Sequence, residues 1–149
     1  VLLRLRGCPG FGLRHDGPDL LFRSFTTAGA PSSLAKRGVL YYELEIMRLG
    51  KGALIQSGFA TPAFEVGVHK PTGAGVGDDA LSVGVDGIRK EIWFDRAPRP
   101  WSCEWGVGDV IGLAANVETG EMAVSRNGSW DCDGCGVVIR VDAMRKGVY

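Results

Sequence analysis

The stretch that decides the fold is Trp105 to Ser129, WGVGDVIGLAANVETGEMAVSRNGS, because turn residues and apolar pattern agree in it over two consecutive strands. Gly106, Gly108 and Asp109 are typical turn residues. Apolar side chains then recur at the two-residue period of a strand with one buried face. They are Ile111, Leu113, Ala115 and Val117.

A return strand follows this first strand. Glu118-Thr119-Gly120 supplies a polar turn with a glycine that can adopt positive φ. Met122 and Val124 then repeat the alternation, and Asn127-Gly128 is the dipeptide best suited to a turn with left-handed backbone angles. The sequence therefore predicts a β-hairpin with four side chains committed to the core: Ile111, Leu113, Met122 and Val124.

The composition is that of one globular domain. The chain has 149 residues, of which 45% are hydrophobic and 23% charged. Seventeen basic residues balance seventeen acidic ones, so the sequence lacks the strong positive charge on which non-specific nucleic-acid binding relies. No apolar run approaches the roughly 20 residues that cross a bilayer. We therefore expect a single domain over residues 1–149, with no nucleic-acid and no membrane partner.

Short strands recur along the chain at intervals of about 8 to 12 residues, which is typical of an antiparallel sandwich or barrel. The expected strands and apolar runs are Val1–Arg6, Leu20–Phe25, Gly38–Ile46, Ala53–Ala60, Leu81–Val85, Ile88–Phe94 and Val137–Val141. Pro98 and Pro100 place the segment up to Trp105 in a loop. Asp142 to Lys146 is expected to form one turn of helix. The predicted class is all-β, with at most one short helical turn.

Two patterns that could carry catalysis have simpler interpretations. Glu43 and Glu45 share one face of a strand about 7 Å apart, as acid and nucleophile do in some glycosidases on sandwich folds. A polar outer face of an antiparallel strand gives the same pattern, and we favour that interpretation. The run Thr72 to Gly77 resembles a phosphate cradle, but two carboxylates follow it in place of Lys and Ser or Thr. We therefore predict that the protein is not an enzyme.

The four cysteines are Cys8, Cys103, Cys132 and Cys135. Cys132-Asp-Gly-Cys135 has the spacing of half a zinc site or of a redox pair. A zinc site needs further ligands, and no second CxxC or HxxxH occurs; the sequence also shows no βαβ unit for a redox motif. We expect ordinary loop thiols in a reducing compartment, with no metal and no cofactor.

Four blocks of the sequence together resemble the SPRY domain family in order and spacing. They are GVLYYELEI (Gly38 to Ile46), SGFATPAF (Ser57 to Phe64), GVGDDALSVGVDG (Gly75 to Gly87) and WGVGDVIGLAANVETGEMAVSRNG (Trp105 to Gly128). The last block is the most specific. The likeness extends from Gly38 to Tyr149, and the residues before it match as the variable strands that usually precede these blocks.

The resemblance implies a concanavalin-like sandwich of two antiparallel sheets, used in the cytoplasm as a non-catalytic protein-interaction module. Family members bind a short peptide segment or a partner domain of another protein through a loop-built face of the sandwich. Matched position by position, that face takes its residues from Arg23, Thr27, Gln56, Thr72, Gly75, Asp78 and Asp86.

The charge of this face suggests its partner. Asp78, Asp79 and Asp86 make it locally acidic, which predicts a partner segment with a basic or polar anchor. Alternatively, these aspartates cap turns beside Gly77 and Gly87. Carbohydrate binding is a second hypothesis, drawn from the likeness of sandwich architecture to lectins.

The sequence departs from the family in two ways. Family members often carry aromatic or basic side chains where this chain has Thr72, Asp78 and Asp86, so no particular peptide motif is carried over. The family domain also continues with one or two strands after a step that resembles Gly147-Val-Tyr149. We therefore expect the parent polypeptide to continue past Tyr149, with other parts of it supporting this domain.

Overall fold

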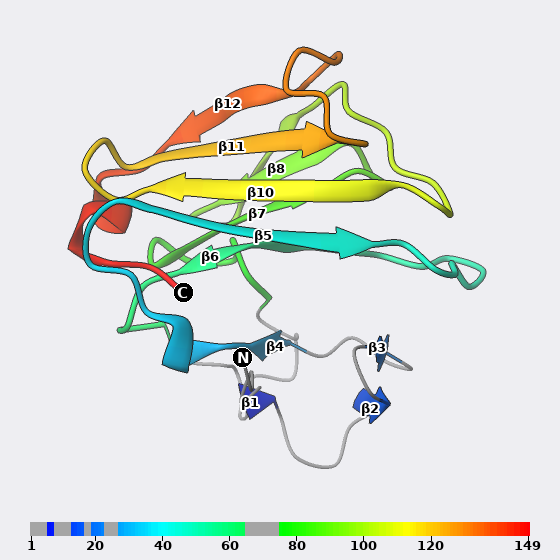
Figure 1. The fold of residues 1–149 in the computed structure, drawn as a ribbon, viewed down its shortest axis with the longest axis horizontal. Coiled ribbons are helices and arrows are strands. Elements are labelled where there is room, and N and C mark those ends of the chain that lie inside the picture. Colours follow the sequence, from blue (N-terminus) through cyan, green and yellow to red (C-terminus); the bar gives the residue numbers. More distant parts are fainter. Residues whose placement is uncertain (1–5, 8–12, 17–18, 23–26, 65–74) are drawn as a thin grey trace.

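Two four-stranded antiparallel sheets pack against each other to form a β-sandwich (Figure 1). A computed structural model describes residues 6–7, 13–16, 19–22, 27–64 and 75–149. Sheet 1 has the strand order β12-β11-β10-β5, from β5 (Val39–Glu45), β10 (Val110–Asn116), β11 (Glu121–Arg126) and β12 (Gly136–Arg140). Sheet 2 has the order β6-β7-β8-β9, from β6 (Ser57–Ala60), β7 (Ser82–Asp86), β8 (Glu91–Phe94) and β9 (Ala97–Pro100). The predicted all-β sandwich is confirmed.

Sheet 1 is centred on the predicted hairpin. β10 pairs with β11 so that Leu113 lies opposite Val124, and its other edge pairs with β5 so that Leu113 also lies opposite Tyr42. Gly120 and Asn127 have positive φ values of 71° and 52°, as expected for the turns at the two ends of β11. Strand β10 is therefore hydrogen-bonded on both sides.

The inward faces of the two sheets form one hydrophobic core. The four side chains that the sequence commits to the core, Ile111, Leu113, Met122 and Val124, are all 0% exposed. Sheet 2 contributes Phe59, Val83 and Val85, which are equally buried. Tyr42 links the layers: its ring packs edge-on against Phe59 with centroids 5.3 Å apart, and its hydroxyl donates to the Gly58 carbonyl at 2.9 Å. Burying each of the aliphatic side chains of this core contributes about 1.5–3 kcal/mol to the stability of the fold.

The segment Ala97–Pro100 is a strand, whereas the sequence predicts a loop there. It pairs with β8 through a tight turn at Asp95 and Arg96, which have positive φ values of 51° and 63°. The prediction was wrong because such turns are usually built from Asn and Gly, and because Pro98 and Pro100 indicated a break. β9 is an edge strand of sheet 2, where proline is tolerated.

Short elements flank the sandwich. β1 (Arg6–Gly7) pairs with β4 (Ala28–Gly29), and β2 (Leu13–Asp16) pairs with β3 (Asp19–Phe22). The predicted helical turn is present as a 3-10 helix over Asp142–Lys146, and a second 3-10 helix spans Pro31–Ser33. Within the described ranges, no helix has the length and apolar character needed to span a membrane.

The last residue of the chain lies at the edge of sheet 2, near β6 (Figure 1). Tyr149 exchanges two backbone hydrogen bonds with Ala60, at 2.9 and 3.0 Å. Val148 exchanges two more with Ala35, at 2.8 and 2.9 Å. Strand β6 itself is shorter than the predicted Ala53–Ala60, since it begins at Ser57.

A polar cluster ties the beginning of the β10–β11 hairpin to its end. The Asp109 carboxylate accepts hydrogen bonds from the Gly106 N–H at 2.7 Å and from Asn127 Nδ2 at 2.8 Å. Asn127 Oδ1 accepts from the Val110 N–H at 2.9 Å, and Arg126 Nε lies 3.2 Å from Asp109 Oδ1. Burial acts to raise the pKa of Asp109, but the hydrogen bonds and the Arg126 charge outweigh it, so the pKa lies below its ordinary value of 3.8.

Replacing Asp109 by Asn tests this cluster. Because its pKa is lower in the folded than in the unfolded chain, the carboxylate stabilises the fold above pH 3.8, and this contribution is lost as the pH falls through the folded-state value. We expect Asp109→Asn to lower the urea midpoint of unfolding near neutral pH. The difference in midpoint between the variant and the unmodified protein should become smaller below about pH 4. Glu45→Gln, on the exposed face opposite Val110, is the control and should leave the neutral-pH midpoint unchanged. A difference in midpoint that stays constant down to low pH would contradict this role.

Candidate functional site

Several of the predicted site residues lie on or against the outer face of sheet 2, the face that points away from the core. Val83 and Val85 of β7 face the core with 0% exposure. Since side chains alternate along a strand, Ser82, Gly84 and Asp86 point to the outer face. All three are nevertheless buried, so other parts of the chain cover β7 from outside.

The loop from Gly75 to Asp78 covers Ser82 and Gly84, and it depends on close backbone contacts. A Cβ atom on Gly84 would lie 2.6 Å from the Val76 carbonyl oxygen, and one on Gly77 would lie 2.6 Å from the Trp93 Cβ. Gly77 also has a φ of 96°, which glycine adopts without strain. The loop can therefore rest directly on β7 and β8.

Asp86 lies at the end of β7 with its side chain fully buried, at 0% exposure. Its Oδ1 accepts hydrogen bonds from the N–H groups of Ile88 and Arg89 at 2.8 and 2.9 Å, and its Oδ2 accepts from Arg89 Nε at 2.7 Å. These contacts favour the interpretation in which Asp86 caps a turn over the one in which it offers a carboxylate to a partner. The carboxylate caps the turn after β7 and is the counter-ion of Arg89.

Arg89 is the functional candidate that the sequence reasoning missed. Its Cζ lies 4.6 Å from the centroid of the Trp93 ring, and its Nε lies 3.7 Å from Glu91 Oε2. Trp93 Nε1 donates to the same Glu91 oxygen at 3.0 Å. Arg89 Nη2 is buried and has no hydrogen-bond partner among the described residues. The sequence gives no signal for this role, because an arginine in a turn is informative only once Asp86 and Trp93 are placed around it.

A shallow groove lies beside this guanidinium and runs along the β8–β9 hairpin. We call it the Arg89 groove; its lining residues are Arg89, Lys90, Glu91, Pro98, Arg99 and Pro100. Arg99 is exposed, and Lys90 Nζ lies 3.7 Å from Glu104 Oε2 at the surface. The groove is thus lined by three cationic residues and two rigid prolines.

Gln56 lies at the same end of sheet 2 as Arg89. It precedes Ser57, which is opposite Val85, so the register places Gln56 beside Asp86. Its Nε2 is buried and makes no hydrogen bond within the part of the chain that the structure describes. Two buried side-chain donors without acceptors, Gln56 Nε2 and Arg89 Nη2, therefore lie at this end of the sheet.

Asp78 and Asp79 lie at the other end of β7 from Asp86. Asp78 Oδ2 accepts from the N–H of Gly75, which is itself buried, at 2.6 Å. Asp79 Oδ1 accepts from the hydroxyl of Ser82 at 2.8 Å. The interpretation in which these aspartates cap turns therefore fits the observed hydrogen bonds, and the structure does not gather them into one acidic patch.

Of the three other predicted residues, Thr27 is the one that the structure describes. Thr27 precedes β4, which pairs with β1 rather than with sheet 2. Arg23 and Thr72 lie outside the described residues. The structure thus places three predicted residues on or against the outer face of sheet 2: Gln56, Gly75 and Asp86. Asp78 lies in the loop that crosses this face.

Glu43 and Glu45 lie on the exposed face of β5 in sheet 1. The Tyr41 hydroxyl donates to Glu43 Oε1 at 2.5 Å, and this hydrogen bond raises the pKa of Tyr41. The placement fits the polar outer face that the sequence analysis favours for this pair.

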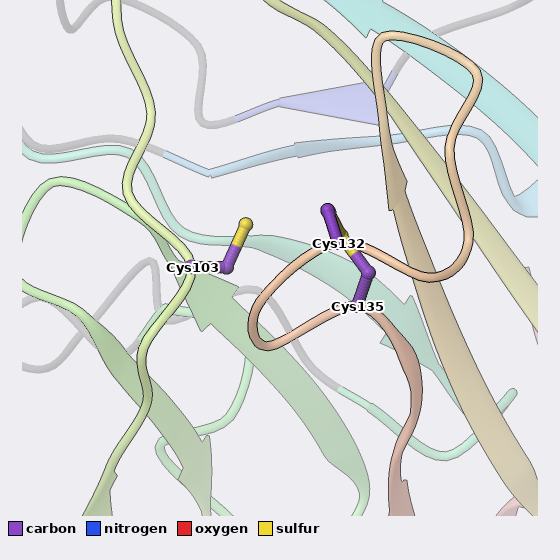
Figure 2. A group of neighbouring side chains, drawn as sticks. All are labelled: Cys103, Cys132 and Cys135. Atoms are coloured by element: carbon purple, nitrogen blue, oxygen red, sulfur yellow. A yellow bond between two sulfur atoms is a disulfide. The ribbon is translucent and has the colours of Figure 1, made fainter.

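Three of the four cysteines come together in the structure, on two separate segments (Figure 2). Cys132 and Cys135 form a disulfide, and Cys103 is a buried free thiol whose Sγ lies within 4.8 Å of both. This corrects the expectation of isolated loop thiols. Burial raises the pKa of the Cys103 thiol, while the Trp105 indole N–H and the charge of Arg126 oppose the rise. Sequence reasoning missed Cys103 because it stands far from the CxxC turn along the chain.

No protein-family model matches the chain. The SPRY resemblance therefore remains a prediction that rests on the four sequence blocks. Its most specific block, Trp105 to Gly128, forms β10, β11 and the Asp109 cluster in this structure.

Substitutions at the two aspartates should separate their roles. Asp86→Ala removes a buried counter-ion and leaves two turn N–H groups unpaired, so we expect a loss of about 3 kcal/mol in the free energy of unfolding. Asp78→Ala removes one hydrogen bond at a half-buried position and should cost about 1 kcal/mol. Urea denaturation at neutral pH measures both. An Asp86→Ala variant as stable as the unmodified protein would show that the carboxylate does not hold the turn.

Proposed function

We propose that this chain is a SPRY-type protein-interaction module, without catalytic activity, that binds an acidic segment of another protein in the Arg89 groove. The observation that carries the proposal is the buried Arg89 Nη2, which lies beside this groove and has no hydrogen-bond partner among the described residues. Leaving a buried donor without an acceptor costs about 1–3 kcal/mol. A partner oxygen that reached Arg89 Nη2 would recover that cost on binding.

The charges around the groove favour a carboxylate as the partner's anchor. Arg89 contributes a guanidinium group and Lys90 an ammonium group, and guanidinium binds carboxylate in a two-pronged geometry. Asp86 is already committed to Arg89 Nε and to the turn, so it is not available to a basic partner. The proposal therefore reverses the sign of the partner that the sequence analysis expects.

The prolines of β9 determine how a segment can bind. Pro98 and Pro100 have no N–H to offer at this edge of sheet 2, so a partner strand cannot extend the sheet through a regular ladder there. Their rings instead form apolar walls beside the guanidinium. Recognition through side chains lying across the hairpin is the mode that this surface supports.

Selection from a displayed library of random peptides tests the proposal directly. We expect enrichment of peptides that carry Asp or Glu, and we expect Lys90→Glu to weaken the binding of a selected peptide about tenfold. The physical reason is that the substitution places a negative charge where the peptide carboxylate binds. Fluorescence anisotropy of a labelled peptide measures the dissociation constant.

Lys146→Glu is the matched control, because it makes the same change of charge at an exposed position of the 3-10 helix. This helix lies near the end of β6 where Tyr149 pairs with Ala60, away from the end near Gln56. It should leave the affinity unchanged. Enrichment of basic peptides, or equal loss of affinity in both variants, would refute the proposed groove. Calcium-dependent binding on a glycan array would instead support the carbohydrate hypothesis.

A further inference from the structure

The thiol cluster, defined as Cys103, Cys132 and Cys135, has a geometry close to that of a metal site. Its three Sγ atoms all lie within 4.8 Å of one another. Two sulfurs bound to one tetrahedral zinc ion lie about 3.8 Å apart. Figure 2 shows Cys103 on its own segment beside the turn that carries the other two. Once Cys132 and Cys135 are reduced, shifts of about 1 Å would let all three sulfurs reach one ion.

The two segments are fastened to each other, which fixes the cluster in place. Trp101 Nε1 donates to the Gly134 carbonyl at 2.7 Å, and the Ser102 hydroxyl donates to Asp133 Oδ1 at 2.8 Å. A Cβ atom on Gly134 would lie 2.5 Å from the Cys103 backbone nitrogen. The turn between Cys132 and Cys135 is therefore pressed directly against the segment that bears the third thiol.

A buried donor lies beside the cluster and would stabilise a negative charge there. Trp105 is 3% exposed, and its indole N–H has no hydrogen-bond partner among the described residues. This N–H faces the Cys103 thiol. A neutral thiol is a weak acceptor, whereas a thiolate held by a metal ion is a strong one. Binding of an ion would therefore give this donor a stronger acceptor than the neutral thiol.

We propose that the reduced thiol cluster binds one thiophilic metal ion, of the type of Zn²⁺ or Cu⁺, through three thiolates. Soft thiolate ligands select such ions over harder cations. A dithiol reductant from solution supplies the two electrons that reduce the Cys132–Cys135 disulfide, and the reductant is itself oxidised to a disulfide. Each cysteine then loses its thiol proton to solvent as its sulfur binds the ion. Formation of the disulfide and binding of metal are thus alternative states of the same residues.

Titration of the dithiol-reduced protein with Cd²⁺ tests the proposal, because cadmium–thiolate bonds absorb in the ultraviolet in proportion to their number. We expect one Cd²⁺ per chain, with the absorbance of three thiolates. Cys103→Ser should reduce that absorbance to about two thirds and weaken binding at least tenfold. The oxidised protein, with Cys132 and Cys135 joined, should bind no Cd²⁺ at the cluster.

Cys8→Ser is the matched control: it removes the remaining cysteine, so an absorbance of three thiolates in that variant assigns all three to the cluster. An absorbance of two thiolates in the unmodified reduced protein, or an affinity that Cys103→Ser does not change, would overturn the proposal. The thiolate count is measured on the unmodified chain, so the test stands even if Cys103→Ser fails to fold. Far-ultraviolet circular dichroism distinguishes that outcome.

Discussion

The packing of the Trp105 indole against Gly87 is the contact on which the arrangement of both candidate sites depends. A Cβ atom at residue 87 would lie 2.1 Å from the indole Cγ, so glycine is required there. The backbone N–H of Trp105 donates to the Gly87 carbonyl at 3.1 Å, and the Trp101 ring packs edge-on against the indole. Trp105 stands where the chain leaves β9 of sheet 2 and approaches β10 of sheet 1. The contact therefore positions the Asp109 cluster on one side and the turn of Arg89 on the other.

The outer face of sheet 2 shows how burial changes the meaning of a charge. From the sequence, the aspartates at positions 78, 79 and 86, which lie in glycine-rich turns, predict an acidic surface. In the structure their oxygens accept hydrogen bonds from nearby N–H and hydroxyl groups, and Asp86 also holds Arg89. The carboxylates thus have structural roles, while Lys90 and Arg99 remain at the surface beside the prolines. The charge that the outer face of sheet 2 presents to solvent therefore comes from its basic residues, because its carboxylates are already hydrogen-bonded within the turns.

The hairpin from Val110 to Arg126 could be predicted closely because local turn chemistry and alternation determine it without help from distant residues. β9 could not, because its turn uses Asp95 and Arg96 in a backbone conformation that neither residue type signals. The position of Gln56 was predicted from the family resemblance, whereas Arg89 and Cys103 gain their candidate roles from contacts between segments. Such contacts follow from the register of the sheets and the packing of loops, and a single sequence contains no direct record of them.

The thiol cluster brings together a segment that follows sheet 2 and a turn within sheet 1. Cys103 follows the edge strand β9 of sheet 2, and Cys132 and Cys135 precede the edge strand β12 of sheet 1. The disulfide within the CxxC turn closes a very short loop and restricts the unfolded chain little. A link that included Cys103 would enclose a loop of roughly 30 residues containing the whole hairpin, and the lost entropy of the unfolded chain would be equivalent to about 3 to 4 kcal/mol of added stability. The chemical state of three sulfur atoms would then determine how firmly the edges of the two sheets are joined.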